Sequence, residues 1–151
     1  RLIINLEKLY LSLKKLALKS EKPDIYYDYS FSLGIPQLQT DKLKEKLFGI
    51  ECNFEELNAI DFKKGCYVGQ ENTARMKLKE KINRRIYPIE IIDGSFEVDD
   101  IVKINKIEIG KIINNSKFSF GLFKFKDPNF KLDEILVTEK AKIKVKKPFW
   151  S

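Results

Sequence analysis

Apolar residues recur at helical spacing near the start of the chain. One helical face collects Leu6, Leu9, Tyr10, Leu13 and Ala17, which predicts an amphipathic helix beginning at Leu6. Pro23 then indicates a break. After it we expect a second short helix, capped by Asp24 and ended by Gly34-Ile35-Pro36, because glycine and proline both stop helices.

Weaker signals complete the first half of the chain. Leu2-Ile3-Ile4 predicts a short buried strand, and Phe48-Gly49 and Cys52-Asn53 indicate turns. Good helix formers follow Gly69 and predict a helix over 70–81.

From Ile82 onward the apolar positions alternate with polar ones, as they do in half-buried strands. Short strands are predicted around 87–91, 102–104, 107–109, 118–122 and 141–145. Asp93-Gly94 is a strong hairpin signal, Asn105-Lys106 and Asn114-Asn115 indicate further turns, and Gly110 indicates a bulge or kink. Five or six strands at this spacing favour a small antiparallel β-barrel, with a domain boundary near residues 80–86.

Composition agrees with one domain, or two small ones, of a soluble protein. The chain has 151 residues, of which 43% are hydrophobic and 34% charged. No apolar run approaches the roughly 20 residues of a membrane helix, and no secretory signal opens the chain, so no membrane partner is expected.

Histidine and cysteine usage narrows the chemistry. The absence of histidine excludes Ser-His-Asp triads, Cys-His dyads and metal sites that use histidine. Cys52 and Cys66 are far from a C-x-x-C spacing, so neither a disulfide framework nor a zinc site is expected. This cysteine usage fits a reducing cytosol and predicts a cytoplasmic location.

The net charge of +7 is concentrated in one part of the chain. Residues 63–86 hold 8 basic and 2 acidic side chains, which gives +6, whereas residues 1–62 sum to −1 and residues 87–151 to +2. Such a window is either a solvated helix face or a local site for a phosphate, a carboxylate or nucleic acid.

The basic window begins beside Cys66, where two glycines flank a cysteine just before the predicted third helix. Glycine allows close approach of a ligand, and the free amides of a helix start attract anions and lower the pKa of a nearby thiol. Lys64 and Arg75 would add positive field. Cys66 is therefore a candidate reactive or metal-binding thiolate, or else an inert buried residue.

Glu71, Arg75 and Tyr67 each allow two interpretations. Glu71 and Arg75 are spaced i,i+4, so they form either a helix-surface salt bridge or contacts to an amino-pyrimidine edge and an acidic ligand tail. Tyr67 either stacks on an aromatic ligand or packs in a core. Cys52 has no supporting neighbours and is interpreted as a packing residue.

The string Lys64-Gly65-Cys66-Tyr67-Val68-Gly69-Gln70-Glu71, followed by Ala74-Arg75, resembles the K-G-C-Y-x-G-Q-E signature of the YgfZ family. These are folate-binding proteins related to the glycine cleavage T-protein, an aminomethyltransferase. Supporting matches are Gly34-Ile35-Pro36, Glu55, the 58–62 stretch and Arg84-Arg85, so the resemblance extends from about Tyr26 to Pro148.

The resemblance implies a fold and a function. The fold would be α+β: residues 1–81 would form the C-terminal part of a mixed α/β folate-binding domain, and residues 82–151 a small antiparallel β-barrel. Roughly the N-terminal half of the family fold, with one wall of the folate site, would be missing. The family is associated with assembly or repair of iron–sulfur proteins, and an older family label concerns tRNA modification.

The resemblance also implies site residues and partners. Cys66 would be the functional thiol, with a transient iron–sulfur contact, and tetrahydrofolate the cofactor. Cofactor-binding roles transfer to Lys64, Gly65, Tyr67, Gly69, Gln70, Glu71 and Arg75. Partners would be iron–sulfur assembly proteins or client enzymes, and no resident metal is expected.

Departures from the family pattern and two alternatives complete the picture. Ser30 stands where many members have arginine, Ser32 where an acidic residue is frequent, and Lys79-Glu80 where a glycine is common. One alternative is an aminomethyltransferase, whose corresponding segment lacks the G-C-Y-x-G-Q-E string. The other is an RNA-binding module, which the scarcity of aromatic residues in the basic window disfavours.

Overall fold

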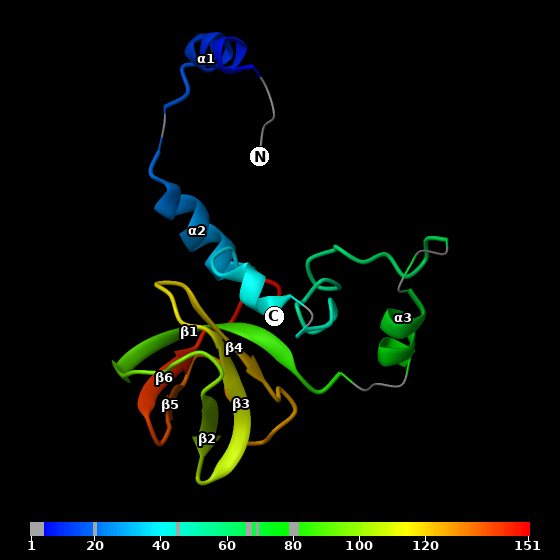
Figure 1. The fold of residues 1–151 in the computed structure, drawn as a ribbon, viewed down its shortest axis with the longest axis vertical. Coiled ribbons are helices and arrows are strands. Elements are labelled where there is room, and N and C mark those ends of the chain that lie inside the picture. The colour runs from blue at the N-terminus through cyan, green and yellow to red at the C-terminus, as the bar shows by residue number, and fades with distance from the viewer. Residues whose placement is uncertain (1–4, 20, 45, 66–67, 69, 79–81) are drawn as a thin grey trace.

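The computed structural model combines helices with one antiparallel sheet (Figure 1). It describes the chain except residues 1–4, 20, 45, 66–67, 69 and 79–81, so the predicted strand at residues 2–4 lies outside the described residues. The helices are α1 (Leu6–Lys15), α2 (Pro23–Ser32), the short 3₁₀ helix η1 (Thr40–Leu43) and α3 (Gln70–Leu78). The strands are β1 (Arg85–Gly94), β2 (Ile101–Ile104), β3 (Ile107–Asn114), β4 (Ser119–Phe123), β5 (Ile135–Val137) and β6 (Ala141–Val145).

The six strands form a barrel-like sheet in the order β2-β3-β4-β1-β6-β5, with every neighbouring pair antiparallel. β1 is the longest strand and holds the sheet together. Its first half pairs with β4, from Arg85↔Phe123 to Ile89↔Ser119, and its second half pairs with β6, from Ile89↔Val145 to Gly94↔Ala141. The predicted combination of helices with a small antiparallel sheet is confirmed, and the sheet is barrel-like; the folate-binding domain assigned to residues 1–81 stays a prediction.

Two apolar layers lie on the two faces of this sheet. The larger one is enclosed by the strands and is built from Ile89, Phe96, Val102, Ile109, Ile112, Phe123, Ile143 and Val145, with Tyr87, Leu136 and Ala141. The smaller one lies on the other face and joins Ile86, Ile113, Phe120 and Leu122 to Phe31 of α2 and to Leu43, Leu47 and Cys52. Residues of β4 contribute to both layers, which explains why all five of its residues are buried.

Period-two spacing located the strands well but misplaced one hairpin. The Asn105-Lys106 turn is confirmed: both residues have positive φ, and Ile104 pairs with Ile107 across it. The register shift opposite Gly110 confirms the predicted irregularity. The hairpin expected at Asp93-Gly94 is wrong, because these residues end β1 and pair with β6 instead of turning into β2.

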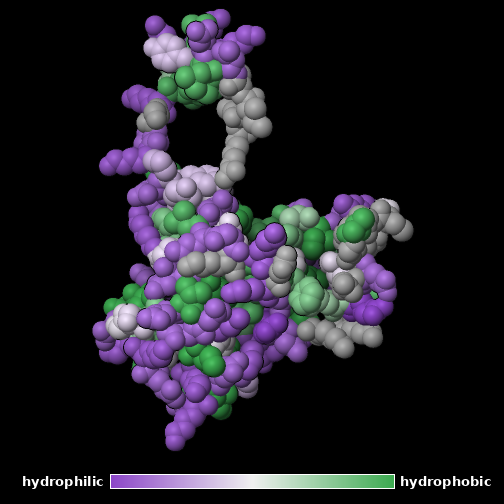
Figure 2. All heavy atoms as spheres, viewed as in Figure 1, coloured by the Kyte–Doolittle hydropathy of each residue, from purple (hydrophilic) through white to green (hydrophobic). Residues whose placement is uncertain are grey.

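The first helix forms as predicted but buries nothing. Asn5 caps α1 through its side chain, which accepts from the amides of Glu7 and Lys8. None of the side chains of α1 is buried, and Leu6 is 82% exposed. Figure 2 shows its apolar atoms on the surface, in a part of the molecule that stands away from the barrel. No helix among the described residues has the length and apolar character required to cross a membrane.

The second helix starts two residues earlier than predicted. Pro23 is the first residue of α2 and Lys22 the cap position, so Asp24 lies in the first turn and does not cap the helix. Proline suits this position because its missing N–H would have no partner there.

The C-terminus lies against the end of α2 (Figure 1). The indole Nε1 of Trp150 donates to the carbonyl of Leu33 at 2.8 Å, although the two residues are 117 positions apart. Gly34 follows with φ of +72°, and a Cβ there would meet Pro148 at 3.3 Å. The Gly34-Ile35-Pro36 stop therefore ends α2 and also leaves room for the C-terminal segment.

Candidate functional site

The candidate segment runs from Lys64 into α3, which stands beside the barrel (Figure 1). Three of its predicted site residues, Cys66, Tyr67 and Gly69, lie outside the described residues. At Gly65 an added Cβ would meet no heavy atom within 4 Å, and Val68 is fully exposed. Lys64 is also exposed. Gly65 and Val68 therefore face open space.

Within α3, the two charged candidates contact each other. Gln70 is the first helical residue, and one turn later the guanidinium of Arg75 donates to the carboxylate of Glu71 on the exposed surface. This is the salt bridge that the i,i+4 spacing indicates. A ligand that used either side chain would have to compete with this pair.

The far end of α3 contacts the turns that precede it in sequence. Lys77, in the last helical turn, forms an ion pair with Glu55, and its ammonium lies 4.0 Å from the centre of the Phe62 ring. Among the described side chains of α3 none is buried, and only Thr73, Ala74 and Met76 are partly covered. Polar contacts therefore contribute much of its attachment.

Residues 51–56, here called the acidic turn, are bound to the start of β1. The buried carboxylate of Glu51 pairs with Arg84, and Glu56 pairs with Arg85. Backbone contacts add to this: the amide of Ile86 donates to the carbonyl of Glu51 at 2.9 Å, and the fully buried Asn53 donates through Nδ2 to the carbonyl of Ile86 at 2.9 Å. Sequence reasoning missed this arrangement.

The acidic turn changes the picture of the basic window. Of its eight basic residues, Arg75, Lys77, Arg84 and Arg85 form ion pairs, and the acids opposite the last three lie outside the window in sequence. The three glutamates at positions 51, 55 and 56 were the sequence signal for these ion pairs, although their spacing does not show which basic residue each one contacts. Acids from outside the window therefore offset three of its six excess positive charges in space.

Cys52 behaves as a packing residue, as predicted. Its side chain packs on the apolar layer that contains Ile86 and Phe120. Burial, together with the negative charge of Glu51, raises the pKa of this thiol from 9.0 to about 11. Cys52 is consequently a poor nucleophile near neutral pH.

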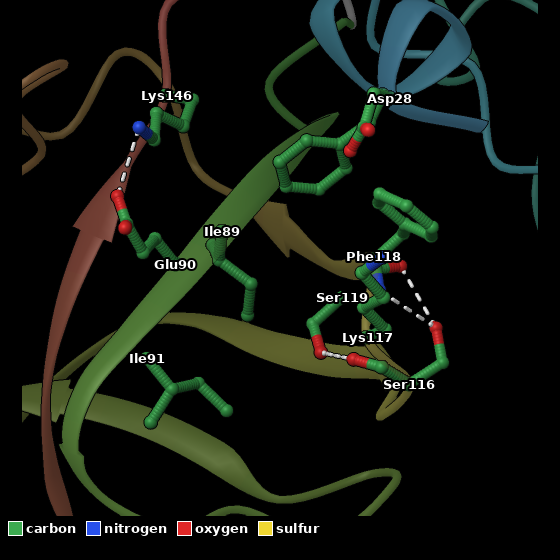
Figure 3. A pocket seen from close by; sticks show the side chains of 10 residues that line it. Asp28, Ile89, Glu90, Ile91, Ser116, Lys117, Phe118, Ser119 and Lys146 are labelled. Carbon is green, nitrogen blue, oxygen red and sulfur yellow. Dashed lines mark hydrogen bonds and ion pairs between the residues drawn. The ribbon is translucent and has the colours of Figure 1, made fainter. Parts of the chain in front are cut away.

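A cavity of about 400 Å³ lies between α2 and the barrel (Figure 3), and none of its lining residues belongs to the candidate segment. Most of its polar side chains already have protein partners: Lys146 pairs with Glu90 at 2.8 Å, and the hydroxyl of Ser119 donates to the carbonyl of Ser116 at 2.6 Å. Among the residues that the structure describes, no group of three or more cysteine, aspartate or glutamate side chains is arranged to hold a metal ion.

The described residues of the candidate segment do not fit tetrahydrofolate by themselves. Gly65 and Val68 face open space, and the carboxylate and guanidinium of Glu71 and Arg75 are bound to each other. Small-molecule sites usually enclose most of their ligand. A folate here would need a second wall that these residues do not provide.

Comparison with known proteins relates the chain to assembly factors for iron–sulfur clusters. It is 34% identical over 94 residues to the mitochondrial iron–sulfur cluster assembly factor IBA57 homolog of Neurospora crassa, which covers 56% of this chain and 21% of that protein. The IBA57 homolog of Dictyostelium discoideum is 39% identical over 71 residues, covering 47% and 17%, and mouse IBA57 is 35% identical over 66 residues, covering 44% and 18%. No family model matches the chain.

The matched segment spans about a fifth of the length of these relatives. Their names agree with the iron–sulfur association that the resemblance implied, and they do not test the YgfZ attribution itself.

The prediction of a cytoplasmic location is wrong. The relatives from Neurospora, Dictyostelium and mouse are all named as mitochondrial proteins. The prediction rested on cysteine usage, which reports a reducing environment but does not distinguish one reducing compartment from another.

Proposed function

We propose that this chain is part of a mitochondrial iron–sulfur cluster assembly factor that works with the cluster assembly machinery. The observation that carries the proposal is its similarity to three proteins with that name, at 34–39% identity over 66–94 residues. The barrel-like sheet and the adjoining helix α3 supply a folded support for such a role, and the chain's segment 64–75 is the place where sequence and chemistry point to function.

The finer proposal assigns the functional thiol to Cys66. In sequence, Cys66 precedes the first residue of α3 by four positions and follows Lys63 and Lys64. Both features favour the thiolate form, which is the form that binds iron. Cys66 would lose its proton and serve as a transient ligand to a cluster passing to a client protein.

Tetrahydrofolate binding is a further proposal on the same segment. It is supported by the eight-residue signature from Lys64 to Glu71 and requires additional residues to complete the pocket. No step of cluster transfer is assigned to the folate.

A complementation experiment tests the proposed function. The full gene product would be expressed in Dictyostelium cells depleted of their IBA57 homolog, and mitochondrial iron–sulfur enzyme activities would be measured. The unaltered protein and Cys52→Ala should restore these activities, whereas Cys66→Ala should not. Failure of the unaltered, mitochondrially located protein to restore them contradicts the proposed function. Full activity of Cys66→Ala contradicts only the role of the thiol.

A further inference from the structure

The helix that carries the candidate segment has little apolar anchorage. α3 has nine residues, and none of its described side chains is buried. Helices of this length are marginal in water unless tertiary contacts stabilise them. Contacts at the ends of α3 therefore have a large influence on where the candidate segment is held.

The acidic turn, by contrast, is firmly held by the barrel. Ile50 beside it is 1% exposed, and Glu51 and Asn53 are buried within it. Side-chain and backbone hydrogen bonds connect it to Arg84 and Ile86 at the start of β1. The acidic turn therefore has a fixed position next to the barrel.

The Glu55–Lys77 ion pair links the acidic turn to α3. Glu55 belongs to the acidic turn, and Lys77 belongs to the last turn of the helix, where the helix dipole also favours a positive charge. The Phe62 ring lies under the Lys77 ammonium at 4.0 Å and restricts its position. Both charged side chains are partly exposed, so salt screens their attraction.

We infer that Glu55 is a positioning residue for the candidate segment: through Lys77 it fixes α3 to the barrel, and loss of this contact allows α3 to open independently of the barrel. The contact needs no partner molecule. The importance of the Glu55–Lys77 contact for activity rests on the proposed function of residues 64–75. The effect of this contact on α3 is independent of that function.

Hydrogen exchange of the full protein tests the inference directly. Glu55→Gln keeps the size of the side chain and removes its charge. At low salt it should raise the exchange rates of the α3 amides by roughly 1.5- to 5-fold, the range for one partly exposed ion pair. The β1 and β4 amides should not change. In 1 M NaCl the difference between the variant and the unaltered protein should disappear.

A control variant and a charge-reversal series make the test specific. Glu108→Gln removes a comparable Lys–Glu pair on the barrel, Lys124–Glu108, and should leave α3 exchange unchanged. Glu55→Lys and Lys77→Glu should each loosen α3, and the double variant should recover most of the protection.

Two results overturn the inference: equal α3 exchange in Glu55→Gln and the unaltered protein at low salt, or loosening of the barrel and α3 together. Neither result bears on complementation by the unaltered protein, so failure here is distinguishable from failure of the proposed function.

Discussion

The carboxylate of Glu51 is buried, and Arg84 meets a single one of its oxygens with two guanidinium nitrogens. The Arg84 Nε and Nη2 atoms lie 3.0 and 2.9 Å from Oε1 of Glu51, while the amide of Phe48 donates to Oε2 at 3.1 Å. Arg84 itself is about half exposed. The pair therefore consists of a covered anion and a cation that water can still reach, and its two members should respond differently to substitution.

Replacement of Arg84 should cost more stability than replacement of Glu51. Arg84→Met leaves the Glu51 carboxylate buried without a cation, which should lower the free energy of unfolding by about 3 kcal/mol. Glu51→Gln removes the charge and keeps an acceptor, and the released guanidinium can be hydrated, so a loss of about 1 kcal/mol is expected. Urea unfolding followed by circular dichroism measures both. The reverse order would contradict this account of the pair.

Alkaline pH should weaken the fold through Cys52. Because burial raises the pKa of this thiol to about 11, the native state keeps the proton that the unfolded state releases above about pH 9. The contribution of the protonated Cys52 thiol to the free energy of unfolding is complete below pH 9. It falls as the pH rises from 9 to 11 and changes no further above 11. The expected loss is about 1–2 kcal/mol, after allowance for partial exposure.

Cys52→Ala isolates this effect from other groups that titrate in the same range. Unfolding free energies of both proteins would be measured between pH 8 and 11.5. The difference in unfolding free energy between the two proteins should shrink by the same 1–2 kcal/mol as the pH rises, since about that much is lost with the thiol proton. A difference that stays constant with pH would show that Cys52 ionises equally in the folded and unfolded states.

Substitution of two glycines by alanine should have very different effects on stability. Gly94 ends β1 with φ of +83°, and a Cβ there would lie 2.5 Å from the carbonyl oxygen of Lys140. Gly94→Ala should therefore lower stability by about 3 kcal/mol. Gly65→Ala enters open space and should leave thermal stability within about 0.5 kcal/mol. Differential scanning calorimetry distinguishes them, and similar losses at both positions would refute the prediction.

Trp150 should stabilise the junction between α2 and the C-terminus. Trp150→Phe keeps an aromatic ring near Tyr87 and removes the donor to Leu33, so a loss of about 1 kcal/mol is expected. Phe149→Ala is the control, since Phe149 is 74% exposed and should matter little. Chemical denaturation of the two variants gives the comparison, with equal losses counting against a role for the indole N–H.

Local patterns predicted the strands because each strand alternates within a few residues. They could not predict which strands pair. β1 ends at Asp93-Gly94 with turn-type residues, yet its partner there is β6, about fifty positions later. β5 was missed because three residues are too few for a period to be recognised.

The residues of the candidate segment could be recognised in the sequence, but the contacts that surround the segment could not. The signature from Lys64 to Glu71 is visible in the sequence, and so is the Glu71–Arg75 pair. The pairing of Glu55 with Lys77 joins residues 22 positions apart through a turn without periodicity, so only the folded chain reveals it. The amphipathic pattern of α1 predicted a helix correctly and implied a buried face that the structure does not contain.

The contact between Leu33 and Trp150 also has a consequence for biosynthesis. The ribosome synthesises α2 and β1 well before it synthesises β6 and the Trp150 indole that donates to Leu33. Until then one side of the second half of β1 has no strand to pair with. Nascent chains should consequently expose an unpaired strand edge, and attract chaperones, from the synthesis of β1 until the synthesis of β6.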